Sequence, residues 1–304
     1  MKRTVDKSMF KEETSMERKT YLIKVLTPLH VGAGQGLGHV DLPVVREAHT
    51  NFPYIPGTAI KGAIREYWIR QVAEKKGEKP SEVDKQVVEN KNDKDIQFLV
   101  KVFGSAGEGA NTEEPSGGSG RYLFTDAKVL LFPVKSVKGI FALITCPYVI
   151  KRFAEDTDMD LPSFQASDDI ALVYKDSLVA ERDRVLLEEF LFKAEQKDEL
   201  SQVFEKLPLE DYQKRRIVCV SDTVFKDMVS QYTEIQTHIK INPDTGTVSK
   251  PALWTQEYVP TETVFYFNLF VREEVEGFDI PQKLHLGGDI TTGKGFVSFR
   301  EVKT

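Results

Sequence analysis

The chain has 304 residues, 40% of them hydrophobic, which is enough for one large domain or two small ones. No apolar run reaches the roughly 18 residues of a membrane-spanning helix, and residues 1–19 lack the apolar centre of a signal peptide. We therefore expect a cytoplasmic protein with a disordered leader and no membrane partner. The net charge of −6 disfavours a nucleic-acid ligand, but residues 121–152 are mainly basic, and this basic strip keeps such a ligand possible.

The first half of the chain alternates between strand and helix patterns. Branched apolar residues alternate over residues 20–27, which predicts a strand. Apolar residues recur at helical spacing over residues 58–75 and predict a helix, and residues 81–103 predict a second, more polar helix. Residues 104–120 are too rich in glycine and polar residues to pack, so we expect a mobile loop.

The second half is richer in strands, and residues 20–304 together are expected to form a single domain. The predicted elements are a hairpin of strands over 122–134 and 139–147, a short helix near 148–154, an acidic insertion with scattered strands over about 154–213, a helix from Ser221 to Tyr232, a projecting hairpin over about 235–260, and strands over 263–272 and 296–302. This order resembles a ferredoxin-like unit with large insertions, so the expected fold class is α+β.

Cysteine and histidine spacing predicts no built-in metal centre. Cys146 and Cys219 are far apart, each in an apolar run, as is typical of buried free thiols. None of the five histidines has a zinc-ligand spacing.

The segment from Leu29 to Arg65 carries the strongest functional pattern. It has glycine at every second position over four repeats, namely Gly32, Gly34, Gly36 and Gly38. Such a run cannot pack as a strand or helix, so its backbone can approach a ligand closely. An isolated acid, Asp41, follows the run, and the next helix carries Lys61 and Arg65 on one face. Together these features predict a ligand that bears phosphate.

A second glycine-rich loop, residues 286–295, nearly matches a phosphate-binding P-loop. Gly293 and Lys294 fit that motif, but Gly295 stands where the magnesium-binding Ser or Thr belongs, and a strand follows instead of a helix. We therefore exclude a nucleotide-hydrolysing P-loop. The loop can still follow a nucleic-acid backbone through its amides and one lysine.

Each residue also has an ordinary structural explanation. Asp41 alone would be a turn or cap residue, Lys61 and Arg65 a solvated helix face, and Trp254 part of the core. The co-occurrence of these features favours a functional site. The candidate nucleic-acid-binding residues lie in the two loops, the polar segment after Asp41 and the helix, and they are Gly34, Gly36, Arg46, His49, Lys61, Arg65, Gly293 and Lys294.

Three segments resemble the repeat-associated mysterious proteins (RAMPs) of CRISPR systems. They are LTPLHVGAGQGLGHVDLPVVRE, FPYIPGTAIKGAIREYW and GGDITTGKGFV. With the later segments HIKINPDTGTV and ALWTQEYVP, they are most similar to the RAMP group that forms the backbone of type III-B effectors, the Cmr complexes. The resemblance covers residues 21–302.

The resemblance implies a fold and a function. The fold would be an RRM-like palm, with insertions that form fingers and a β-hairpin thumb. Copies of the chain would stack into a helical filament on a guide crRNA, together with other Cmr subunits. Each copy would cut the paired target RNA beside its thumb, with a divalent metal ion such as Mg²⁺ as cofactor.

The resemblance also implies site residues. The family's catalytic aspartate falls on Asp41, which would also contact the metal ion. His30, Tyr258 and Glu257 fall near positions tied to the same site. Gln256 is a departure from the family pattern, which has an acid there.

Two alternatives to a guide-dependent endoribonuclease stay open. One is a non-catalytic crRNA-binding scaffold of the same architecture. The other is a RAMP ribonuclease that processes guide RNA, acts alone on repeat RNA and uses a histidine near the glycine-rich loop, here His30.

Overall fold

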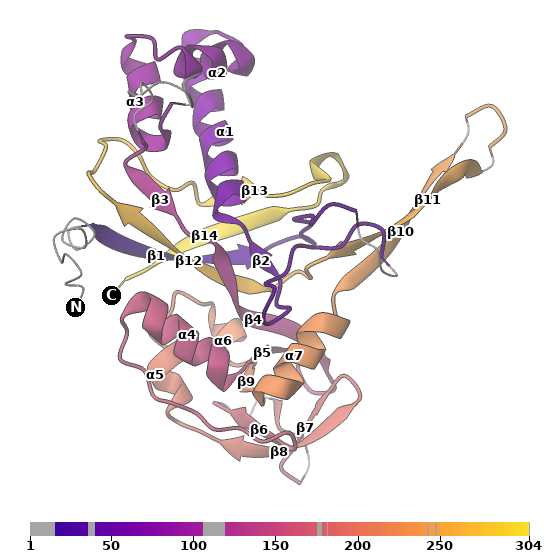
Figure 1. The fold of residues 1–304 in the computed structure, drawn as a ribbon. Coiled ribbons are helices and arrows are strands. Elements are labelled where there is room, and N and C mark those ends of the chain that lie inside the picture. Colours follow the sequence, from indigo (N-terminus) through magenta and orange to yellow (C-terminus); the bar gives the residue numbers. More distant parts are fainter. Residues whose placement is uncertain are drawn as a thin grey trace, which may run out of the picture.

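The computed structural model describes residues 16–35, 40–105, 119–174, 178–180, 182–241, 243–246 and 248–303. Over these residues the chain has a mixed α/β fold, in agreement with the predicted class. One sheet of 12 strands runs through the described part, and two further strands form a separate hairpin that projects from the body (Figure 1).

Three antiparallel strands lie together near one end of the sheet, namely β1 (Glu17–Val25), β12 (Val264–Val271) and β14 (Phe296–Val302). β1 lies between the other two. The assignment of residues 17–19 to a disordered leader was wrong, because pairing with β12 extends β1 back to Glu17, which lies opposite Val271. Residues 1–15 of the predicted leader lie outside the described residues. The short strand β13 (Lys283–His285) pairs with β14 at the edge.

Three helices follow β2 (Tyr54–Ile55) and pack together on one side of the sheet (Figure 1). α1 (Gly57–Lys76) agrees with the predicted helix. The single helix predicted over 81–103 is instead two helices, α2 (Pro80–Val88) and α3 (Lys94–Phe103). The chain turns at Asn90, whose φ is 49°, and the Asp93 side chain starts α3 by accepting hydrogen bonds from two backbone amides.

The predicted mobile loop over 104–120 lies mostly outside the described residues. Its ends meet, because Gly104 pairs with Ser119 in an antiparallel bridge. β3 (Tyr122–Phe124) then pairs with β12.

Six strands in the second half close into a barrel-like ring. In pairing order they are β4 (Ala127–Ser136), β5 (Ile140–Thr145), β9 (Ile217–Cys219), β6 (Ile170–Val173), β8 (Phe190–Gln196) and β7 (Arg184–Leu187). The pair Ser136–Leu187 joins β7 back to β4. The predicted acidic insertion supplies three of these strands, and its Val185 and Phe192 are buried, so it belongs to the core of the fold. The helices of this half are α4 (Pro147–Thr157), α5 (Leu200–Phe204), α6 (Asp211–Lys214) and α7 (Asp222–Gln231).

The projecting hairpin consists of β10 (Glu234–Ile241) and β11 (Val248–Tyr258), close to the range of about 235–260 predicted for it. It follows α7, which begins where the Ser221 hydroxyl accepts a hydrogen bond from the Val224 amide at 3.1 Å. Its base remains next to the sheet, while the two strands extend away from the body (Figure 1).

Both cysteines are buried free thiols, as predicted, and burial raises the pKa of Cys146 and of Cys219. Among the described residues, no helix combines the length and the apolar character that crossing a membrane requires.

Candidate active site at the base of the hairpin

The two glycine-rich loops lie side by side although they come from opposite ends of the chain. The Gly288 amide donates to the carbonyl oxygen of His30 at 3.0 Å, and the Gly295 amide donates to that of Pro28 at 3.0 Å. A Cβ atom at Gly287 would lie 2.1 Å from the His30 carbonyl oxygen, and its φ is +75°, so this contact requires glycine.

His30 is held in one orientation between the loops and the hairpin. Its Nδ1 atom lies 2.7 Å from the carbonyl oxygen of Glu257. Because a carbonyl oxygen only accepts, Nδ1 carries the proton, and Nε2 of the neutral ring is an acceptor. A Cβ atom at Gly32 would lie 2.7 Å from that Nε2 atom, so glycine at this position makes room for the ring. His30 can therefore accept a proton at a fixed place beside the first loop.

Asp41 presents an exposed carboxylate next to β11. Its Oδ2 atom accepts hydrogen bonds from the Thr255 amide at 2.7 Å and from the Thr255 hydroxyl at 2.8 Å. These donors lower the pKa of Asp41, so its side chain is ionised at neutral pH. Leu42 pairs with Gln256 in a parallel bridge, which fixes the segment after the first loop along β11.

The Asp41 carboxylate faces an open cavity of about 440 Å³. The cavity is lined by Gln35, Asp41, Leu42 and Trp254. Trp254, expected in the core, is only half-buried and lines this cavity.

We expect Thr255→Val to raise the pKa of Asp41, because the hydroxyl donor is lost while the backbone donor remains. The pKa of Asp41 should rise from its lowered value toward the ordinary value of 3.8. Carbon-13 NMR titration of the Asp41 carboxyl would measure it. Thr255→Ser keeps the hydroxyl and should keep the low pKa, whereas one common pKa in all three proteins would contradict the assignment.

Tyr258 is buried at the centre of a polar network. Its hydroxyl donates to Asp289 Oδ2 at 3.0 Å, and the Gln256 side chain donates to the same oxygen at 2.6 Å. His238 Nε2 lies 3.2 Å from the Tyr258 hydroxyl and must be the donor there, because the tyrosine proton goes to Asp289. Burial and the Asp289 carboxylate raise the pKa of Tyr258, so it stays a neutral phenol. Lys294 Nζ lies 5.0 Å from the centre of the tyrosine ring.

His238 and Asp289 belong to this network but were not predicted from the sequence. Asp289 is the only acid of the distal loop, a signal that could have singled it out. His238 becomes visible only through strand register, which places it opposite Trp254 and near Tyr258.

Glu257 and Arg46 lie inside the structure and pair with each other. Glu257 Oε1 accepts from Arg46 Nη2 at 2.5 Å and from the Thr233 hydroxyl at 2.7 Å, and Oε2 accepts from the Val44 amide at 2.9 Å. The side chains of Arg46 and Glu257 are only 15% and 8% exposed. This geometry occupies both Glu257 oxygens and turns Arg46 inward, so the structure brings neither group to the cavity beside Asp41.

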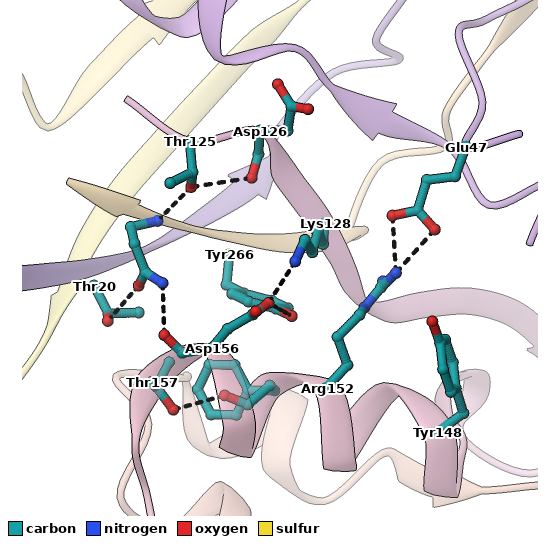
Figure 2. A network of polar contacts seen from close by, with 12 residues as sticks. Thr20, Glu47, Thr125, Asp126, Lys128, Tyr148, Arg152, Asp156, Thr157 and Tyr266 are labelled. Carbon is teal, nitrogen blue, oxygen red and sulfur yellow. Dashed lines mark hydrogen bonds and ion pairs between the residues drawn. The ribbon is translucent and has the colours of Figure 1, made fainter. Parts of the chain in front are cut away.

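His49 lies on a loop that is fixed to the second half of the fold. Arg152 Nη1 of α4 donates to both carboxylate oxygens of Glu47 at 2.8 Å, as Figure 2 shows. In the same network, Asp156 accepts from Lys128 and from Tyr266, each at 2.7 Å. His49 itself is exposed and its Nε2 atom lies 3.5 Å from the hydroxyl of Tyr148 on α4. The structure therefore places His49 with α4 and not with Asp41.

The two cations on α1 differ in their surroundings. Lys61 is half-buried, and desolvation, with help from the neighbouring charge of Arg65, lowers its pKa. Arg65 Nη2 pairs with Asp84 of α2 at 2.6 Å. A nucleic-acid phosphate would have to compete with that carboxylate for Arg65.

Much of the basic strip is neutralised within the fold. Five of its cations pair with acids, namely Arg121 with Glu273, Lys128 with Asp156, Lys135 with Glu188, Lys151 with Glu155, and Arg152 with Glu47. The strip is therefore a weaker ligand surface than the sequence suggests.

The loop glycines are the remaining residues of the predicted nucleic-acid-binding set. Gly34 is exposed with φ +90°, and Gly293 ends a turn, η3 (Ile290–Thr292), in open space. Gly36 lies outside the described residues.

Within the described part of the chain, no three His, Cys, Asp or Glu side chains gather as metal ligands. Asp41 is thus the one predicted ligand, and any ion there would be completed by water or by a bound phosphate.

Two adjoining glycine-rich loops, a projecting hairpin and an exposed acid beside β11 together define the candidate site. The model of the RAMP superfamily matches residues 22–298, and the chain belongs to this superfamily. The match confirms the family resemblance found in the sequence motifs.

Individual relatives narrow the comparison. The chain is 34% identical to "CRISPR system Cmr endoribonuclease Cmr4" of Pyrococcus furiosus, over 92% of this chain and 94% of that protein. The crystal structure of oligomeric Cmr4 from Pyrococcus furiosus superposes with a TM-score of 0.65 at 26% identity, covering 95% of this chain and 100% of that one. A subunit of the Type III-B Cmr-beta complex bound to cognate target RNA shares the fold, with a TM-score of 0.69 at 20% identity and coverage of 94% and 97%.

Proposed function

We propose that this chain is the backbone subunit of a cytoplasmic type III-B CRISPR (Cmr) effector in antiviral defence. It binds guide crRNA, stacks with further copies of itself and with other Cmr subunits, and cuts complementary target RNA at regular intervals. One observation carries the proposal. The chain is similar over nearly its whole length to a protein named an endoribonuclease. The ionised Asp41, exposed at the base of the projecting hairpin, supports the proposal.

The architecture suits this task. In our proposal, β1, β12 and β14 with α1 form a ferredoxin-like, RRM-like palm, the insertions form the fingers, and the β10–β11 hairpin is the thumb. A thumb that enters the guide–target duplex would unstack it, which costs a few kcal/mol but bends the backbone toward a cleavable geometry. Recognition would be independent of sequence, because base pairing with the guide selects the target.

The chemistry would use the RNA's own 2′-hydroxyl. Its oxygen attacks the adjacent phosphorus, the 5′-oxygen leaves, and one proton is lost from the nucleophile while another reaches the leaving oxygen. Asp41 has a low pKa and is a weak base, so we assign it to positioning and to charge. His30, with Nε2 as an acceptor, is the stronger candidate for taking the proton.

A divalent ion, Mg²⁺ in our proposal, would be held by Asp41 and by RNA phosphate, and it would supply positive charge for the developing phosphorane. EDTA is then expected to abolish cleavage while target RNA stays bound. It should leave thermal unfolding unchanged, because a single carboxylate does not tie a metal to folding. Returning Mg²⁺ should restore cutting, and an undiminished rate in EDTA would remove the metal from the proposal.

The complex reconstituted with guide RNA tests the function. Evenly spaced products from a complementary RNA, and none from an unrelated RNA, are expected. If a complex that contains Asp41→Ala cuts as fast as wild type, this chain is a scaffold and another subunit cuts. If the isolated chain cuts repeat RNA, it is a guide-processing ribonuclease.

A further inference from the structure

The hairpin has two unlike faces. On one face Ile235, Ile239 and Leu253 are at least half exposed, at 58%, 50% and 67%. The other face carries His238 and Trp254, which lie directly opposite each other in the register of β10 and β11. Since side chains alternate along a strand, these two rings form an aromatic face that is separate from the aliphatic one.

The two rings stack on each other and are anchored from below. Their centres are 5.3 Å apart and their planes differ by 13°. His238 is in turn held by the Tyr258 hydroxyl, which is fixed by Asp289. These contacts therefore preorganise the indole ring in the absence of a ligand.

Trp254 also lines the Asp41 cavity, and we infer from the order of the strands that its second ring face is turned to it. β10 flanks one edge of β11, and residues 41–42 flank the other edge through the bridge of Leu42 with Gln256. His238 thus covers the indole from the β10 side, and the cavity lined by Asp41, Leu42 and Trp254 lies on the opposite side. A flat group that enters the cavity would meet the indole face and the Asp41 carboxylate together.

We propose that Trp254 is a stacking platform for one unpaired base of the target RNA, next to the bond that is cut. The inference rests on the proposed function and adds the element that positions the substrate. Every nucleobase has a π-face, so an aromatic platform accepts any sequence. A stacked base would hold its own ribose and phosphate beside Asp41.

The experiment is a double-mutant cycle in the full complex. It combines removal of the Trp254 ring with removal of one base from the target RNA. Target RNAs each carry one abasic nucleotide, moved stepwise across a cleavage position, and single-turnover rates are measured at saturating target. At one position the abasic RNA should be cut about tenfold slower by the wild type. Trp254→Ala should slow intact RNA by a similar factor and show no further loss with that abasic RNA. Trp254→Phe keeps a ring and should retain most of the rate.

Leu253→Ala, on the aliphatic face, is the matched control. Whatever the cleavage rate of this variant on intact RNA, the abasic nucleotide should slow it by the same factor as in the wild type. The proposal is overturned if Trp254→Ala leaves the rate unchanged, or if it loses rate but keeps the full abasic effect. A wild-type complex that does not cut would instead refute the proposed function, which separates the two failures.

Discussion

Replacing Asp41 with alanine is expected to stop target cleavage almost completely while guide and target RNA stay bound. Holding an ion that stabilises charge in the transition state is worth several kcal/mol, or about 100-fold or more in rate. Asp41 is the one predicted catalytic group that is exposed at the hairpin base. Its carboxylate makes its side-chain contacts with Thr255 at the surface, so the fold should not depend on it. Single-turnover cleavage and equilibrium binding of labelled target would measure the two effects separately.

Two asparagine variants sharpen this test. Asp41→Asn keeps the size and an acceptor for Thr255 but removes the charge, so it should be nearly as slow as the alanine variant. Asp158→Asn removes an exposed carboxylate at the end of α4, at a left-handed position with φ 50° that asparagine tolerates, and should cut normally. Loss of target binding in Asp41→Asn would show that the carboxylate acts in binding and not in cleavage.

Local patterns predicted those elements whose sequence signal is also their structural cause. The apolar spacing over residues 58–75 corresponds to α1, and the strand predicted over residues 296–302 corresponds to β14. The break between α2 and α3 was missed because a cap at Asp93 outweighed the helical character of the surrounding residues. The insertion over 154–213 appeared peripheral because its strands find their partners only in three dimensions, such as β6 with β9.

The candidate site divides in the same way. Asp41 and the two loops stand out in the sequence, since a glycine run and a nearby acid need no partner to be noticed. The sequence cannot tell whether Asp41 or Glu257 is the exposed acid beside β11, because the register of the strands decides the direction of each side chain. This register directs Glu257 toward Arg46 and brings Tyr258 to Asp289, a residue 31 positions away.

Glu257→Ala is expected to lower the free energy of unfolding by about 3 kcal/mol, because it leaves the inward-facing Arg46 charge without its carboxylate partner. The Val44 amide and the Thr233 hydroxyl would lose their acceptor as well. Denaturant unfolding of the isolated chain would measure the loss. Glu273→Ala is the control. Glu273 pairs with Arg121, and their side chains are 65% and 31% exposed, respectively, so loss of this pair should cost less than about 1 kcal/mol.

The same position separates a structural role from a catalytic one. A double-mutant cycle of Arg46→Met and Glu257→Gln should show a coupling energy above about 1 kcal/mol, since the two groups are in direct contact. In the assembled complex, Glu257→Gln should keep a substantial cleavage rate, because the carboxylate lies away from the cavity beside Asp41. If Glu257→Gln instead abolished cleavage at unchanged stability, Glu257 would be a catalytic residue, and the hairpin base would have to rearrange when RNA binds.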